Sequence, residues 1–198
     1  MIRLVYDLSK KFLLTAVLVV SYTAHAAVLK GVLFSPQSRY TVCFTPGDNC
    51  TQMIVQALNQ AKSEVYVQAY SFTSRPIVEA LIRTKERGVN VHVLLDKSNM
   101  RGRYSVIQAL NQHRISYLID EKPAIAHNKV MIIDGSRVIT GSFNFTNNAQ
   151  SRNAENAIII DDKNLARYYL TNFKSRESQS VPAGRFYAKH RSWGSRNI

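Results

Sequence analysis

Apolar and polar residues recur along this chain with two alternating periods, which predict strands and helices in turn. Alternation at every second position indicates strands, and apolar residues three or four apart indicate helices. Asp134-Gly135 is a turn signal between two apolar runs, and Gly88 ends a helical stretch. We expect strands at 40–44, 64–70, 89–95, 115–119 and 156–160, a hairpin from 129 to 140, and helices at 49–62, 75–87, 104–112 and 163–173. This order predicts an α/β fold with a mixed β-sheet flanked by helices.

The N-terminal segment departs from this pattern. Arg3, Lys10 and Lys11 precede an apolar run over 12–20, and Ala24-His25-Ala26 is a small-residue cleavage pattern. Together they predict a secretory signal peptide over 1–26 and a secreted, periplasmic protein without stable membrane association after cleavage. A retained anchor is the alternative, although the run is shorter than the roughly 20 residues of a membrane span.

The C-terminal segment 174–198 is polar and basic, and we expect an extension beyond a main domain over 27–173. Its low apolar content favours a flexible or loosely docked segment. Phe186, Tyr187 and Trp193 would also suit packing against the domain, and the sequence leaves both options open.

The charge of the chain favours polyanionic partners. The formal net charge is +13, and it becomes +11 when Arg3, Asp7, Lys10 and Lys11 are removed with the signal peptide. A basic excess attracts nucleic acid backbones whatever their base sequence, although a basic solvated surface would give the same count.

The chemistry of the chain concentrates in one segment, His127-Asn-Lys129-Val-Met-Ile-Ile-Asp134, followed by Gly141-Ser142-Phe-Asn144. If Asp134 and Gly135 alone make the turn, Ile133 pairs with Ser136 and His127 lies opposite Ser142. A four-residue loop instead places His127 opposite Asn144 and Lys129 opposite Ser142. Either register gathers these polar groups at one end of a hairpin.

These groups suit the cleavage of phosphodiesters. A neutral His127 imidazole can attack phosphorus and form a phosphohistidine. Lys129 and Asn144 can hold the nonbridging oxygens, and Ser142 can add a hydrogen bond. Glu155 is the best candidate to bind the second ring nitrogen of His127 and fix its tautomer.

The pattern His-x-Lys-x4-Asp with Gly-Ser-x-Asn resembles the phospholipase D superfamily, and more closely its bacterial Nuc-type endonucleases. Val67-Gln-Ala-Tyr-Ser-Phe-Thr-Ser74 and Leu95-Asp-Lys-Ser-Asn99 are also similar, so the resemblance runs from about 40 to 161. It implies a phospholipase D-like sandwich in which His127 is the nucleophile, Lys129 and Asn144 bind phosphate, Ser142 assists and Glu155 supports the histidine. Asp134, at the turn, and Gly141 are motif positions with a structural role.

Larger superfamily members carry two copies of this motif, whereas His25, His92, His113 and His190 lack a lysine two residues later. The chain therefore supplies half of a site. A second His127 across a two-fold axis would protonate the leaving oxygen, and the small family members are similarly homodimers that share one active site.

Three further features admit two interpretations each. Lys97, Arg101 and Arg103 follow a predicted strand and either line a substrate groove or belong to a solvated loop. Tyr70, Phe72, Phe143 and Phe145 either stack bases or, as we favour, pack in the core. Cys43 and Cys50 either form a disulfide, which export permits, or pack separately as a buried strand residue and a first-turn helix residue.

The sequence thus predicts a metal-independent endonuclease that acts on DNA, with RNA as an open second substrate, and with little sequence specificity. No cofactor is expected, and no cluster of acidic, cysteine and histidine residues has metal-ligand spacing. The alternatives are a phospholipase D-type hydrolase acting on phosphatidyl lipids and a non-catalytic nucleic-acid-binding module.

Overall fold

The computed structural model describes residues 31–101 and 106–190, and the described residues from Leu33 onward form one compact unit. The predicted signal peptide, Arg103, Trp193 and the start of the helix predicted at 104–112 lie outside the described residues. The elements are β1 (Arg39–Thr45), α1 (Cys50–Asn59), β2 (Glu64–Ala69), α2 (Arg75–Glu86), β3 (Asn90–Asp96), the 3-10 helix η1 (Lys97–Met100), α3 (Ile107–Gln112), β4 (Tyr117–Asp120), β5 (Lys129–Ile133), β6 (Arg137–Gly141), α4 (Asn147–Ser151), β7 (Glu155–Asp161), α5 (Lys163–Glu177), β8 (Val181–Pro182) and α6 (Ala183–Lys189).

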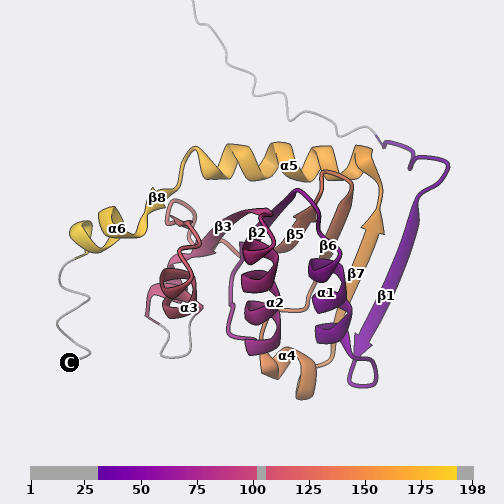
Figure 1. Cartoon of the computed structure of the whole chain (residues 1–198), viewed down its shortest axis with the longest axis horizontal. Coiled ribbons are helices and arrows are strands. Elements are labelled where there is room, and N and C mark those ends of the chain that lie inside the picture. The colour runs from indigo at the N-terminus through magenta and orange to yellow at the C-terminus, as the bar shows by residue number, and fades with distance from the viewer. Residues whose placement is uncertain (1–30, 102–105, 191–198) are drawn as a thin grey trace, which may run out of the picture. The chain divides into compact units, whose positions relative to one another are not determined.

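Within the described residues, the strands form a single eight-stranded sheet in the order β1-β7-β6-β5-β2-β3-β4-β8 (Figure 1). The neighbours β2, β3 and β4 run parallel, and each remaining neighbouring pair is antiparallel. The predicted mixed sheet is therefore confirmed. Its antiparallel half is the late hairpin β5–β6 together with β7 and β1.

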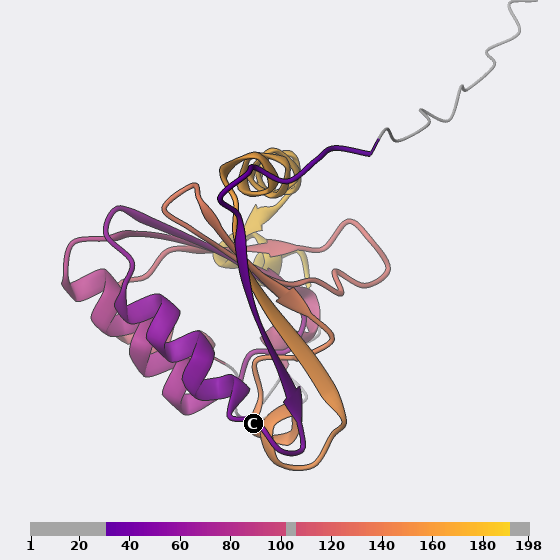
Figure 2. The same cartoon turned by 90° about the vertical axis from the view of Figure 1, so that its right-hand side faces the viewer.

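Helices cover both faces of the sheet (Figure 2). On one face, α1 and α2 pack over a large apolar core that includes Ile54, Leu58 and Leu81. On the other face, α5 contributes Ala166 and Phe173 to a second, smaller core. Both cores form because strand residues of alternating parity point to opposite faces. The described residues contain no helix with the length and apolar character needed to cross a bilayer.

The β5–β6 hairpin has a three-residue turn, so both registers expected from the sequence were wrong. Ile133 pairs with Arg137 and Met131 with Ile139. Asp134 and Gly135 have positive φ angles of 51° and 58°, and Ser136 completes the turn by donating its N–H to Ile133 O at 3.1 Å. The Ser136 carbonyl also accepts a hydrogen bond from Asp162 N at 2.8 Å, which continues the β6–β7 ladder one pair beyond Arg137 and Asp161.

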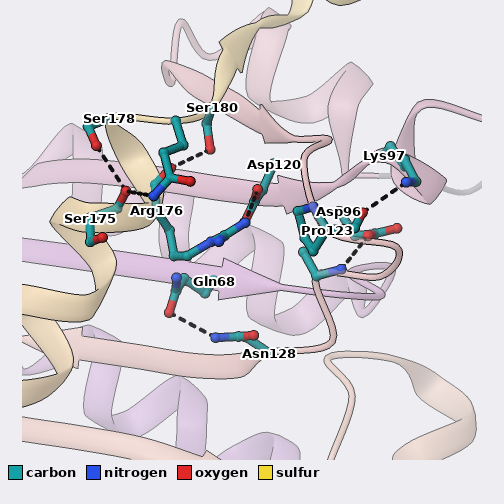
Figure 3. A network of polar contacts seen from close by, with 12 residues as sticks. Gln68, Asp96, Lys97, Asp120, Pro123, Asn128, Ser175, Arg176, Ser178 and Ser180 are labelled. Carbon is teal, nitrogen blue, oxygen red and sulfur yellow. Dashed lines mark hydrogen bonds and ion pairs between the residues drawn. The ribbon is translucent and has the colours of Figure 1, made fainter. Parts of the chain in front are cut away.

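The C-terminal segment docks on the sheet as far as the described residues extend. The expected boundary after 173 falls inside α5, which continues to Glu177, and β8 then pairs with β4 through Ile119 and Val181. Phe186 in α6 is 1% exposed. Arg176 donates two hydrogen bonds, of 2.8 and 2.6 Å, to the buried carboxylate of Asp120, as Figure 3 shows. These contacts favour packing over the flexible alternative.

Cys43 and Cys50 form a disulfide that joins β1 to the first residue of α1. Both cysteines are buried, so each also occupies the packing position expected of it without a bridge. Asn49 caps the helix by accepting a hydrogen bond from Gln52 N at 2.9 Å.

Candidate active site

The predicted catalytic side chains gather where three adjacent antiparallel strands meet. Lys129 begins β5, Gly141 ends β6 and Glu155 begins β7, so all three lie at the same end of the sheet. Gly141 has φ 148°, and a Cβ atom there would lie 2.9 Å from Ala157 Cα and collide with the Asn156 backbone. Glycine at 141 therefore allows the close approach of β6 and β7 beside the site.

His127 and Lys129 form the centre of this group. The Lys129 ammonium lies 3.0 Å from both ring nitrogens of His127 and donates to the His127 carbonyl at 3.0 Å. The His127 ring packs against Tyr70, with ring centroids 4.5 Å apart. His127 is exposed and Lys129 is only 7% exposed, so an accessible imidazole stands over a buried cation.

The electrostatic environment of Lys129 makes its charge sensitive to pH. Burial lowers the pKa of Lys129 from its ordinary value, and the nearby carboxylate of Glu155 opposes that shift. Burial prevails, because desolvation disfavours the ammonium more than this single carboxylate stabilises it.

Glu155 belongs to a hydrogen-bond network with Ser142. Its carboxylate accepts from Ser142 Oγ at 2.6 Å and from Asn153 Nδ2 at 2.8 Å. Ser142 Oγ in turn accepts from the backbone N–H of Asn156 at 3.1 Å. Within the described residues Glu155 makes no hydrogen bond to His127, so the predicted support of the imidazole is not formed in the single chain. The structure places Glu155 where it holds Ser142 and acts on Lys129 through its charge.

Asn144 lies beside these groups with one unused polar atom. Its side-chain Oδ1 is buried and has no hydrogen-bond partner among the described residues. An unpaired buried carbonyl is costly, and a donor brought by a ligand would satisfy it. A phosphodiester carries no such donor, so the predicted phosphate contact of Asn144 would use its Nδ2 group, and Oδ1 stays open to a donor from another part of a ligand.

Two of the three predicted loop cations line a cavity next to His127. The cavity has a volume of about 400 Å³, and its lining includes Lys97, Arg101, Ile125 and one acidic residue, Asp96, with Tyr70 as the wall shared with the catalytic group. Its two cations outnumber this one carboxylate, so we call it the basic cavity. Lys97 also donates to Pro123 O at 3.0 Å, as Figure 3 shows. The location agrees with the groove interpretation for Lys97 and Arg101.

Three buried polar residues that position the site were missed by sequence reasoning. Asp96 is 2% exposed and accepts the N–H of Ala126, next to His127, at 2.7 Å. Asn99 donates to Tyr70 O at 2.7 Å, and Thr45 Oγ1 accepts from Glu155 N at 3.2 Å. The only signal for two of them was the segment Leu95–Asn99, which contributed to the family resemblance without an assigned role.

Asp134 lies at the opposite end of the hairpin, away from the chemistry. Its carboxylate accepts the N–H groups of Lys62, Ser63 and Glu64 as well as the Ser63 hydroxyl, at 2.8 to 3.2 Å. Burial would raise the pKa of Asp134, but these donors together hold it below its ordinary value. This is the structural role expected of a turn residue.

Comparison with known proteins identifies the family. The protein-family model described as cardiolipin synthase, PLD-like domain, matches residues 54–176 of this chain. The phospholipase D of Rickettsia prowazekii (strain Madrid E) is 49% identical over 144 residues, which are 73% of this chain and 70% of that protein. The chain belongs to the phospholipase D superfamily. The human mitochondrial cardiolipin hydrolase, another relative, is 30% identical over 150 residues, 75% of this chain and 60% of its own length.

Solved structures of the superfamily share the fold. Nuc from Salmonella typhimurium, a phospholipase D family member, has a TM-score of 0.70 and 33% identity, covering 74% of this chain and 98% of Nuc. NucT from Helicobacter pylori has a TM-score of 0.68 at 22% identity, covering 74% of this chain and 99% of NucT, and shows the fold alone. The expected phospholipase D-like fold and Nuc-type membership are confirmed, and the chain is a superfamily hydrolase of the phosphodiesterase type.

Proposed function

We propose that this hydrolase is a metal-independent endonuclease that cleaves DNA, and RNA as a second substrate, with little sequence preference. A ring nitrogen of His127 attacks phosphorus, the bond from phosphorus to the leaving oxygen breaks, and an acid protonates that oxygen. Water then hydrolyses the phosphohistidine and releases the imidazole. Lys129 and Asn144 hold the nonbridging oxygens. Ser142 assists by donating its hydroxyl proton to Glu155, which holds that carboxylate near Lys129.

The observation that carries this proposal is the exposed His127 ring 3.0 Å from the buried Lys129 ammonium, beside a basic cavity. The cation can neutralise a phosphodiester at the nucleophile, and Lys97 and Arg101, which line the neighbouring cavity, supply further positive charge for a polyanionic backbone. The net charge of +13 favours the same substrate class. The shared fold of Nuc, at 33% identity, adds support.

A phospholipase is the second candidate, because the Rickettsia relatives carry the name phospholipase D. Ile125, which lines the basic cavity, is 55% exposed and would suit contact with lipid. We favour the nuclease because Lys129 at His127, and Lys97 and Arg101 in the adjacent cavity, are cationic groups that suit a polyanionic backbone.

We further propose that the active unit is a homodimer with a shared site, because one motif supplies a nucleophile but no second histidine to act as the acid. An exposed apolar strip supports this assembly. It consists of the exposed Tyr40, Val42 and Phe44 of β1 and the half-buried Ile158 and Ile160 of β7, and Tyr40 is 75% exposed. Val138 of β6, which pairs with Ile160, packs against α5. The helix therefore covers this face as far as β6, and the strip begins at the next strand, β7.

The strip runs to the edge of the catalytic group. Phe44 pairs with Asn156, and the Asn156 amide donates to Ser142 Oγ at 3.3 Å. A second copy seated on the strip around a two-fold axis near Phe44 would therefore bring the two sites together. Soluble monomers rarely leave such contiguous apolar surface uncovered.

Export to the periplasm remains a proposal that rests on the N-terminal sequence. The Cys43–Cys50 disulfide supports it, because such bridges persist in oxidising compartments.

The deciding experiment presents the purified protein with plasmid DNA, RNA and phosphatidylcholine vesicles, all in excess chelator. We expect the wild-type protein to cleave nucleic acid and the His127→Asn variant not to cleave it. The variant should still bind DNA, because it keeps most contacts with the DNA backbone. Head-group release without DNA cleavage would favour the phospholipase. DNA binding without any turnover would favour the non-catalytic module, and activity restored only by a divalent ion would overturn the metal-independent mechanism.

A further inference from the structure

Tyr70 also lines a second cavity, whose lining differs in chemistry from the basic one. Its volume is about 560 Å³, within the range of roughly 300–1,000 Å³ typical of small-molecule sites. Three hydroxyl side chains, Tyr70 and four asparagines line it, and none of these described lining residues is charged. The asparagines are Asn144, Asn147, Asn148 and Asn153.

We call this second cavity the amide cavity. Backbone hydrogen bonds hold its walls, so the fold fixes its shape. Thr73 N and Ser74 N both donate to Phe145 O, at 2.9 and 2.8 Å. Phe72 and Phe145 are fully buried beneath, with ring centroids 5.6 Å apart. Thr146 caps α4 by accepting from Ala149 N at 3.1 Å.

Several lining groups have hydrogen-bonding capacity left over. The side-chain amides of Asn147 and Asn148 are exposed and have no partner among the described residues, and Asn144 Oδ1 is buried without one. An amide carries both donors and an acceptor, so the Asn147 and Asn148 side chains match the edge of a nucleobase, whereas a phosphate uses only a donor such as Asn144 Nδ2. Tyr70 adds an aromatic face on which a base can stack. The acyl chains of a lipid substrate, by contrast, would need a cavity with apolar walls.

Resting on the proposed nuclease function, we propose that the amide cavity is a nucleoside subsite that takes the unpaired base next to the scissile phosphate. Tyr70 touches both His127 and this cavity, so a phosphodiester at His127 places its attached nucleoside there and its continuing backbone toward Lys97 and Arg101. A base reaches the cavity only after leaving its helical stack. The subsite therefore favours single-stranded over duplex substrate.

The test compares two chromogenic diesters that differ only in the nucleoside, the para-nitrophenyl ester of thymidine monophosphate and methyl para-nitrophenyl phosphate. The wild-type protein should show the higher kcat/KM on the nucleoside ester, by about tenfold. Asn147→Leu and Asn148→Leu should each reduce that preference roughly three- to tenfold, the effect of losing one or two hydrogen bonds. Asn59→Leu, the same change at an exposed asparagine that lines neither cavity, should leave it intact.

The outcomes separate the two proposals. Equal wild-type kcat/KM on both esters, or a preference that survives both leucine variants, would overturn the subsite while leaving the nuclease in place. Faster cleavage of a duplex than of its separated strands would also overturn it. Hydrolysis of neither ester nor any oligonucleotide would remove the nuclease function itself, and the subsite with it.

Discussion

At the scale of single residues, the charge of Lys129 should set the alkaline limit of activity. Its ammonium must be protonated to hold phosphate, and burial lowers the pKa of Lys129 while Glu155 raises it. Glu155→Gln removes the opposing carboxylate, so the pKa of Lys129 falls further and activity is lost at a lower pH. The measurement is kcat/KM against pH for both proteins. Ser142→Ala, which removes a hydrogen bond to the same carboxylate but no charge, should leave the alkaline limb in place, and an unmoved limb in Glu155→Gln would contradict the assignment.

The sequence was enough to predict the candidate catalytic residues, but not the buried residues that position them. His127, Lys129, Ser142 and Glu155 stand out because their spacing and type point to one reaction. Asp96 could not be found this way, because its bond to Ala126 N joins segments 30 positions apart. The bond of Glu155 to Ser142, in place of the expected one to His127, likewise depends on how β6 and β7 approach.

At the scale of elements, the Asp134 turn should contribute measurable stability to the β5–β6 hairpin. Asp134→Asn keeps the size and tolerates the positive φ, but it replaces one acceptor oxygen with an amide that faces N–H donors. We expect the free energy of unfolding in urea at pH 7 to fall by about 1–3 kcal/mol. The folded pKa of Asp134 lies below its ordinary value of 3.8, so its stabilisation is present above that value and is lost as pH falls through the depressed pKa.

The difference between the Asp134→Asn variant and the wild-type protein should therefore shrink on acidification. Ser63→Ala removes one donor to the carboxylate and should show a smaller loss with the same pH trend. Equal stability of Asp134→Asn and wild type at neutral pH would show that the network contributes nothing.

Element type followed from periodicity, whereas the register did not. The strand predicted at 64–70 is β2, Glu64–Ala69, and the helix predicted at 75–87 is α2, Arg75–Glu86. The hairpin register was missed by one residue because Ser136 joins Asp134 and Gly135 in the turn, where Asp134 is held by the distant residues Lys62, Ser63 and Glu64. Such contacts leave no local pattern to read.

At the scale of the whole molecule, the sequence predicted a mixed sheet with helices on it but left the C-terminal segment undecided. Val181 and Phe186 are too few apolar residues to predict an element by pattern. They dock because β4 offers an open edge to β8 and because Arg176 neutralises the buried Asp120. The apolar strip on β1 and β7 is the opposite case, because the single chain leaves its β1 side chains exposed.

The shared site makes a quantitative prediction for mixed dimers. If His127 of one subunit attacks while the partner's His127 donates the proton, a dimer with one His127→Asn chain cannot complete the reaction. After verified subunit exchange, activity should fall as the square of the wild-type fraction, because both subunits must be intact. If a second copy covers the apolar strip, Val42→Asp would bury a charge in the dimer interface. This variant should therefore be a folded monomer without activity. A linear decline with fraction, or full activity in that monomer, would show that one chain suffices.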